Sequence, residues 1–202
     1  MSGAGPQLWL IRHGETEWSA SGKHTSRTDV ALTEKGIERA AELGSFLAGT
    51  PFCAVFRSPM RRARETCELA GFGPSAVVED DLREWDYGVY EGRTTREIQQ
   101  EIPGWSVWTH AIEGGESLEQ VGARADRVIA AALEAADERS TNGPCNVALF
   151  GHAHILRIVA ARWVGLPPGG GALLALSTGS VSVLGWERER RVIQQWNRGF
   201  EG

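Results

Sequence analysis

Three short apolar runs, each ending in a charged residue or just before a glycine, constrain the fold of this chain most strongly. Gln7–Arg12, Phe52–Arg57 and Asn146–Phe150 have the length and unbroken apolar character of strands that are covered on both faces. Segments with helical spacing lie between them. This alternation of strand and helix predicts an α/β layered fold with a mostly parallel sheet.

Start and stop signals mark the helices between these runs. Helices are expected after Thr33, at Ser58-Pro59 and running to about Gly71, after Ser117 with a capping box to Gln120, and after His152 to about Gly165. The last part of the chain predicts three more strands, at Leu173–Leu176, Ser180–Trp186 and Val192–Trp196, with GWERERR as a hairpin turn.

Length and charge exclude several functional classes. With 202 residues, 42% of them hydrophobic, the chain can bury its core as one domain over residues 1–202. A net charge of −5 gives no electrostatic footprint for nucleic acid or an anionic membrane. The N-terminal residues lack the features of a secretory signal, and no run approaches the roughly 18 apolar residues of a membrane span. We therefore expect a soluble, cytoplasmic protein, with homo-oligomerisation left open.

The three cysteines fit no disulfide framework or redox pair. Cys53, Cys67 and Cys145 are odd in number, widely spaced and set in apolar or helical surroundings. We expect three buried, reduced thiols.

The first run ends on the triplet Arg12-His13-Gly14. Ligands of open α/β sheets bind outside the carboxyl ends of the strands, and Gly14 removes a side chain where a ligand could approach the backbone. Taken alone, the triplet fits a turn with a surface histidine better than a functional site.

The other two apolar runs are also followed by a charged or an imidazole side chain. Arg62 falls in the first turns of the helix in FRSPMRRARET, where a guanidinium can bind a phosphate that the helix dipole already favours. His152 follows a strand in ALFGHAHILR and precedes a helix, so two imidazoles could face one anion. A metal site at His152 and His154 is disfavoured, because helical steps of ~100° turn His154 away from its neighbour.

A glutamate lies among aromatic residues in DLREWDYGVYEG. Desolvation disfavours the charged form of a carboxyl group, so Glu84 is expected to have a raised pKa and to donate a proton near neutral pH.

Together these stretches resemble the histidine phosphatase superfamily, whose fold is the phosphoglycerate-mutase-like three-layer α/β/α sandwich with a central, mostly parallel sheet. The motifs stand in the family's order: RHGETEW, TSRTDVALT, SPMRRARET, LREWDYGVYEG and GHAHILR. The resemblance implies that His13 takes up the phosphoryl group and that Arg12, Arg62 and His152 bind the phosphate. Glu84 then protonates the leaving oxygen and activates water. Two arginines and an imidazolium replace a metal, so no cofactor is expected.

The resemblance also implies substrate contacts. The implied contacts are Ser19, Thr25, Ser26, Tyr87 and the backbone at Ala153. Ser19 stands where the family often has asparagine, and its hydroxyl can still reach a phosphate oxygen. His24, Arg27, Arg93 and Arg96 are basic candidates for a second phosphate. Arg93 and Arg96 could instead face solvent beside Glu91 and Glu97, and for Arg96 this alternative is preferred. Trp105, Trp108 and His110 lie in the segment expected to cover the pocket, the tryptophans fitting a core role better than a lid.

The short segment between Glu84 and His152 favours a phosphatase over a mutase. The chain resembles the branch of sugar-bisphosphatases and broad-specificity acid phosphatases, so the expected substrate is a small phosphorylated metabolite. A phosphoglycerate mutase-type phosphoryl transfer remains the alternative. A non-catalytic phospho-ligand sensor is disfavoured, because both His13 and Glu84 are present.

Overall fold

A computed structural model describes residues 5–139 and 145–199 of the chain. Its centre is a six-stranded sheet in the order β3-β2-β4-β1-β5-β6. The strands are β1 (Gln7–Arg12), β2 (Phe52–Arg57), β3 (Ala76–Val78), β4 (Asn146–Gly151), β5 (Val181–Glu187) and β6 (Arg190–Arg198). β1 to β4 are parallel to one another, and the hairpin of β5 and β6 adds an antiparallel edge through the pairing of β5 with β1. The predicted α/β fold with a mostly parallel sheet is confirmed.

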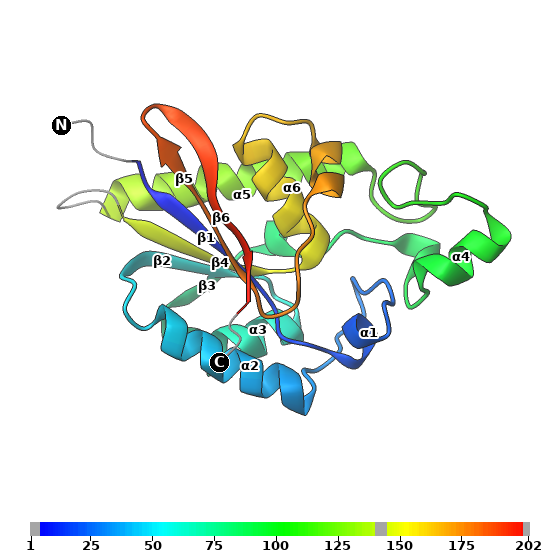
Figure 1. Cartoon of the computed structure of the whole chain (residues 1–202), viewed down its shortest axis with the longest axis horizontal. Helices are drawn as coiled ribbons and strands as arrows, with labels where there is room; N and C mark the ends of the chain where they lie inside the picture. The colour runs from blue at the N-terminus through cyan, green and yellow to red at the C-terminus, as the bar shows by residue number, and fades with distance from the viewer. Residues whose placement is uncertain (1–4, 140–144, 200–202) are drawn as a thin grey trace.

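Helices cover both faces of the sheet (Figure 1). They are α1 (Glu17–Ala20), α2 (Glu34–Leu47), α3 (Arg61–Leu69), α4 (Thr95–Glu101), α5 (Leu118–Arg139) and α6 (Ala153–Trp163), with 3-10 turns at Gly73–Ser75, Asp80–Leu82, Gly88–Tyr90 and Pro168–Leu173. Along β4, Val147 and Leu149 join the core under α5 and α6, whereas Ala148 and Phe150 join the core under α2 and α3. Strand alternation therefore divides the core into two layers of side chains, one on each face.

One predicted helix start and one predicted strand are wrong. The helix predicted to start at Ser58-Pro59 begins at Arg61, because the backbone N–H of Arg61 is capped from another segment by the carboxylate of Asp29 at 2.7 Å. Leu173–Leu176 is not a strand: Leu173 ends a 3-10 turn and the rest is irregular. The capping box of Ser117 with Gln120 and the start of α6 after His152 are confirmed.

The cysteine prediction is also wrong. Cys53 of β2 and Cys145, which directly precedes β4, form a disulfide with their Cα atoms 5.8 Å apart. β2 and β4 are neighbours in the sheet, so residues 92 positions apart in sequence lie side by side. Cys67 alone is a buried free thiol, and burial raises its pKa to about 12. Among the described residues, no helix is long and apolar enough to cross a membrane.

A pair of glycines fixes the turn after β1 against α2. A Cβ atom on Gly14 would lie 2.5 Å from the carbonyl oxygen of Gly36, and one on Gly36 would lie 2.2 Å from the carbonyl oxygen of Glu15. Both glycines are therefore required by the close approach of two backbones. Gly14 leaves room for α2, which replaces the expectation that it leaves room for a ligand.

This contact predicts that Gly36→Ala destabilises the protein, although alanine normally favours a helix interior over glycine. Overpacking against a backbone carbonyl should lower the free energy of unfolding by about 1–3 kcal/mol. Gly49→Ala is the control, because a Cβ atom there meets nothing within 4 Å. Urea denaturation of both variants measures the difference, and a stabilised Gly36→Ala protein would contradict the packing described here.

Candidate active site

The polar residues that follow β1, β2 and β4 meet at one edge of the sheet. Arg12 pairs with Gly151 in the parallel register of β1 and β4, and the backbone N–H of His13 donates to the Gly151 carbonyl at 3.0 Å. The rings of His13 and His152 lie 5.2 Å apart, centroid to centroid. The structure thus brings the two predicted imidazoles together, with their planes tilted by 60°.

His13 is buried and held in one tautomer. Its Nδ1 lies 2.7 Å from the carbonyl oxygen of Gly14, and because a carbonyl only accepts, Nδ1 carries the hydrogen. Burial, followed by the charges of Arg62 and Arg12, holds the pKa of His13 well below its ordinary value. The ring is therefore neutral at pH 7, and its Nε2 has an unshared electron pair.

Arg12 has a buried donor without a protein partner. Its Nη1 donates to the carbonyl of Leu176, but Nε has no hydrogen-bond partner anywhere in residues 5–139 and 145–199. Arg12 and His13 line the same cavity of about 300 Å³. A buried N–H without a partner costs free energy, and an oxygen of a bound anion would remove this cost by accepting its hydrogen bond. The Nε of Arg12 is therefore suited to bind an anion.

Arg62 is fully buried, unlike its neighbours. Its Nε donates to Nδ1 of His152 at 3.1 Å, and its two terminal nitrogens donate to the carbonyls of Thr25, Ser26 and Thr28. Arg61 and Arg64 instead form exposed ion pairs with glutamates one turn along α3. Arg62 thus holds the 25–28 loop against His152, and it is not among the residues that line the cavity beside Arg12 and His13.

His152 is a neutral imidazole, which corrects the predicted imidazolium. Because Nδ1 accepts from Arg62, the hydrogen is on Nε2, which bonds Oγ of Ser58 at 2.8 Å. Burial, and then the charges of Arg62 and His13, hold the pKa of His152 well below its usual value. The positive charge at the site therefore comes from the two arginines.

Glu84 is ionised, which corrects the raised pKa expected from its aromatic neighbours. Its carboxylate caps the N-terminus of α6, accepting the backbone N–H groups of His154 and Ile155 at 3.0–3.1 Å and that of Trp85 at 3.0 Å. Burial alone would raise the pKa of Glu84. The ring and backbone of His154 outweigh this effect and hold the pKa well below its ordinary value. A carboxylate at a helix N-terminus is stable as an anion.

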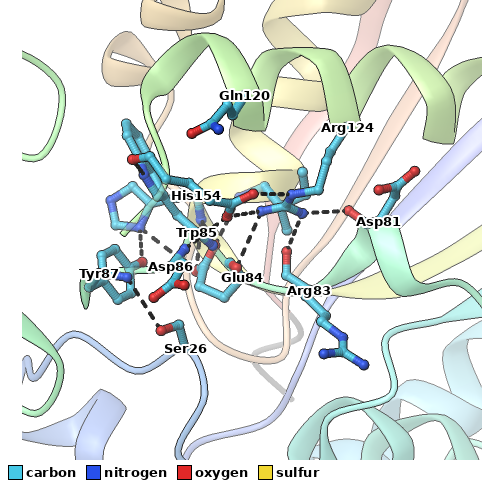
Figure 2. Close-up of polar contacts among 12 residues, drawn as sticks. Ser26, Asp81, Arg83, Glu84, Trp85, Asp86, Tyr87, Gln120, Arg124 and His154 are labelled. Carbon is cyan, nitrogen blue, oxygen red and sulfur yellow. Dashed lines mark hydrogen bonds and ion pairs between the residues drawn. The ribbon is translucent and has the colours of Figure 1, made fainter. Parts of the chain in front are cut away.

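The predicted substrate contacts divide into two groups. Ser19, Thr25, Tyr87 and Ala153 line the cavity with His13 and Glu84, whereas the hydroxyl of Ser26 donates to the carboxylate of Glu91 at 2.6 Å and faces a second cavity. The Ser19 hydroxyl forms a capping box with Thr16. The hydroxyl of Tyr87 keeps its proton, because burial raises its pKa, and it lies 2.7 Å from Nδ1 of His154, within hydrogen-bond distance (Figure 2).

The basic candidates for a second phosphate are mostly occupied. Arg27 pairs with Asp86 and Arg93 with Glu101, while Arg96 is exposed, in line with its solvated alternative. His24 lines the cavity, but burial lowers its pKa to about 4, so it is neutral. Lys23, which the sequence did not single out, lines the cavity without an ion pair to any described residue.

The segment that follows α4 contributes both core and cavity wall. Trp105 is buried in the core, as predicted, and its ring contacts Tyr90, His24 and His110. Trp108 is half-buried and lines the cavity, with the guanidinium of Arg157 4.6 Å from its ring. His110 bonds the backbone N–H of Ser106 and lies outside the cavity lining.

Three residues that the sequence did not reveal support the site. Ser58 fixes His152, Thr66 accepts the backbone N–H of Gly14 at 3.0 Å, and Glu91 accepts three hydrogen bonds from the 26–28 loop. His154, which the sequence indicated only as a member of a disfavoured metal site, lines the cavity between Glu84 and Tyr87. Within the described ranges, no group of three or more His, Cys, Asp or Glu side chains could hold a metal ion.

The fold is that of an α/β protein whose candidate site, with two guanidiniums and two imidazoles, lies at the carboxyl ends of its parallel strands. The family model of the histidine phosphatase superfamily (branch 1) matches residues 8–199. The chain belongs to this superfamily, as its motifs suggested, and is a phosphoric monoester hydrolase of the histidine phosphatase type.

Relatives and solved structures agree with this assignment. The chain is 42% identical over 183 residues to an acid phosphatase of Mycobacterium tuberculosis, covering 90% of this chain and 87% of that protein. It is 37% identical over 186 residues to a sedoheptulose 1,7-bisphosphatase of Saccharomyces cerevisiae, covering 80% and 68%. A solved mycobacterial glucosyl-3-phosphoglycerate phosphatase superimposes with a TM-score of 0.84 at 25% identity, covering 96% of this chain and 100% of that one.

The buried neutral histidines predict a protein that loses stability in acid. His13, His24 and His152 have folded-state pKa values below the ordinary 6.5, so the unfolded chain binds more protons as the pH falls below that value. Glu84, with its lowered pKa, acts in the same direction below about 4.5. Stability is therefore fully present above pH 6.5 and falls towards pH 4.

Urea denaturation at pH 7.5 and pH 5.0 measures this loss. For His24, with a folded pKa of about 4, linkage gives a contribution of about 2 kcal/mol between the two pH values. His24→Gln should therefore lose about 2 kcal/mol less than the wild type over this range. An equal pH dependence of the two proteins would show that His24 is protonated in the folded state.

Proposed function

We propose that residues 1–202 act as one catalytic domain, a metal-independent phosphatase that hydrolyses small phosphomonoesters through a phosphohistidine at His13. One observation supports this most directly. The contact of Nδ1 with the Gly14 carbonyl leaves the electron pair of Nε2 on a neutral ring that lines the cavity. A histidine nucleophile needs such an electron pair.

In the first step, Nε2 of His13 attacks phosphorus, forming an N–P bond while the ester P–O bond breaks. The departing oxygen takes a proton from Glu84, which lines the same cavity. Arg12 supplies an unpaired N–H to a phosphoryl oxygen, and the charges of Arg12 and Arg62 stabilise the transferring group. These guanidiniums supply the positive charge that a metal ion supplies in other phosphatases.

Glu84 takes up a proton when the substrate binds. The resting carboxylate is ionised, and a phosphate dianion beside it adds negative charge, which raises the pKa of the carboxyl group. A substrate that binds as the monoanion brings the same proton directly. Glu84 and the phosphate therefore share one proton in the complex, which fits activity at acidic rather than alkaline pH.

In the second step, Glu84 takes a proton from water as the water oxygen attacks phosphorus. The N–P bond breaks, its electron pair returns to His13, and inorganic phosphate leaves. Glu15, which follows His13 by two residues in the sequence, is a less suitable acid and base. Its carboxylate already bonds Thr33 and Lys35 at the start of α2.

The cavity favours sugar phosphates or bisphosphates as substrates. Its walls combine aromatic faces with the hydroxyl of Tyr87 and the rings of His24 and His154, which suit a hydroxylated carbon chain. Lys23 is the available cation for a second anionic group. A relative named acid phosphatase and one named sedoheptulose 1,7-bisphosphatase agree with this range. A cytoplasmic location remains a prediction, and the Cys53–Cys145 bond is of a kind more common in oxidising compartments.

Phosphoglycerate mutase-type transfer is the alternative that one comparison favours. A probable phosphoglycerate mutase of Salmonella is 27% identical over 198 residues. The two reactions share the phosphohistidine and differ in its acceptor. Adding phosphoglycerates to the labelled phosphoenzyme distinguishes the two reactions. A mutase transfers the labelled phosphoryl group to the phosphoglycerate, whereas a phosphatase releases it as inorganic phosphate.

The proposed mechanism predicts an acid-labile, base-stable phosphoenzyme. Rapid acid quench of the enzyme with a labelled aryl phosphate should trap a phosphoryl group, and His13→Ala should abolish both label and turnover. EDTA should leave the rate unchanged. Activity that is lost in EDTA and restored by a divalent metal, or label that persists in His13→Ala, would contradict the proposal.

A further inference from the structure

The segment that carries Glu84 has little regular structure of its own. Only Asp80–Leu82 forms a 3-10 turn, and residues 83–87 are irregular. The Glu84 carboxylate is fixed by α6, but this contact alone does not fix the backbone from which the side chain extends. Another element must therefore hold the main-chain groups of this segment.

Arg124 of α5 supplies the donors. Its five N–H groups form five hydrogen bonds: Nε and Nη2 to the two carboxylate oxygens of Glu116, and the remaining three to the carbonyls of Asp81, Arg83 and Glu84. The distances lie between 2.6 and 3.3 Å, and the Arg124 side chain is only 11% exposed. Figure 2 shows the guanidinium lying against this backbone.

Glu116 holds the other end of the same segment. Its carboxylate accepts the backbone N–H of Asp86 at 3.0 Å, and its carbonyl accepts the indole N–H of Trp85 at 2.9 Å. Its own N–H donates to the carbonyl of Asp86 at 3.1 Å. The Arg124–Glu116 pair therefore contacts the main chain on both sides of Glu84.

We propose that Arg124, oriented by Glu116, is the positioning residue for Glu84. The pair fixes the Glu84 backbone from α5 while α6 fixes its carboxylate, so the proton-carrying oxygen is held between two helices. This inference rests on the proposed role of Glu84 as acid and base. Such precision matters, because a displacement of about 1 Å can reduce a rate by about 10²-fold.

Arg127 provides a matched control on the same helix. It forms a bidentate ion pair with the carboxylate of Asp81, is 60% exposed, and has no hydrogen bond to the main chain of Glu84. Arg127→Gln therefore removes a positive charge and a contact with the same segment, while the backbone of Glu84 keeps its partners.

The test compares phosphorylation rates with an alkyl phosphate, whose leaving oxygen must be protonated, and an aryl phosphate, which needs much less help. Arg124→Gln should reduce the alkyl rate about 10²-fold and the aryl rate by less than about 3-fold. Arg127→Gln should change neither by more than about 2-fold. In the Glu84→Gln background, Arg124→Gln should cause no further selective loss with the alkyl phosphate, because the positioned group is already absent.

Affinity for inorganic phosphate shows whether the phosphate pocket is intact, and it should be unchanged in Arg124→Gln. If that variant does not fold, Arg124→Lys and Glu116→Gln replace it. Lysine has three donors and cannot form the fork, so it should show the same selective loss with the alkyl phosphate.

Equal losses with both phosphates, or an undiminished selective loss in the Glu84→Gln background, would overturn the positioning role. A different outcome would count against the proposed function itself. If Glu84→Gln alone slows both substrates equally, Glu84 is not the acid, whatever the result for Arg124.

Discussion

The parallel, in-register pairing of β1 with β4 is the constraint on which the candidate site depends. It places the residues after Arg12 and Gly151 side by side, so His13 and His152 face each other without any direct bond between their rings. β2 lies on the other side of β4, and the helix that follows it delivers Arg62 to His152. Because parallel strands end at the same edge of a sheet, residues from three distant parts of the chain converge there.

Burial and charge set the protonation states at this edge. The two guanidiniums are charged and the two imidazoles are neutral, while Glu84 is an anion held by the N-terminus of α6. A neutral His13 is a nucleophile, whereas an imidazolium is not. Of these charged groups, Arg12 and Glu84 line the cavity, while Arg62 is bonded to His152 outside its lining. A phosphate group adds the negative charge that the arginines attract. When this phosphate group binds, Glu84 takes up the proton that the leaving group requires.

Sequence patterns could predict the strands, the sheet type and the positions of His13, Arg62, Glu84 and His152, because these depend on local apolar runs and on what directly follows each strand. Properties set by distant partners could not be predicted. The charge of Glu84 depends on backbone N–H groups 70 or more residues away, which its aromatic neighbours do not reveal. The Cys53–Cys145 bond depends on which strands are neighbours. The four apolar residues at Leu173–Leu176 resemble a strand, but a 3-10 turn ends at Leu173 and the residues after it belong to none of the strands of the described sheet.

The central claim is that Nε2 of His13 attacks a phosphoryl group bound between Arg12 and Glu84. A crystal structure of the protein with vanadate, which adopts the geometry of the transferring phosphoryl group, tests it most directly. The expected structure has a bond from Nε2 of His13 to vanadium and a vanadate oxygen that accepts the Nε hydrogen of Arg12. The Glu84 carboxylate should lie beside the vanadate oxygen opposite Nε2. Vanadate bound through another atom, or seated away from Glu84, would contradict it.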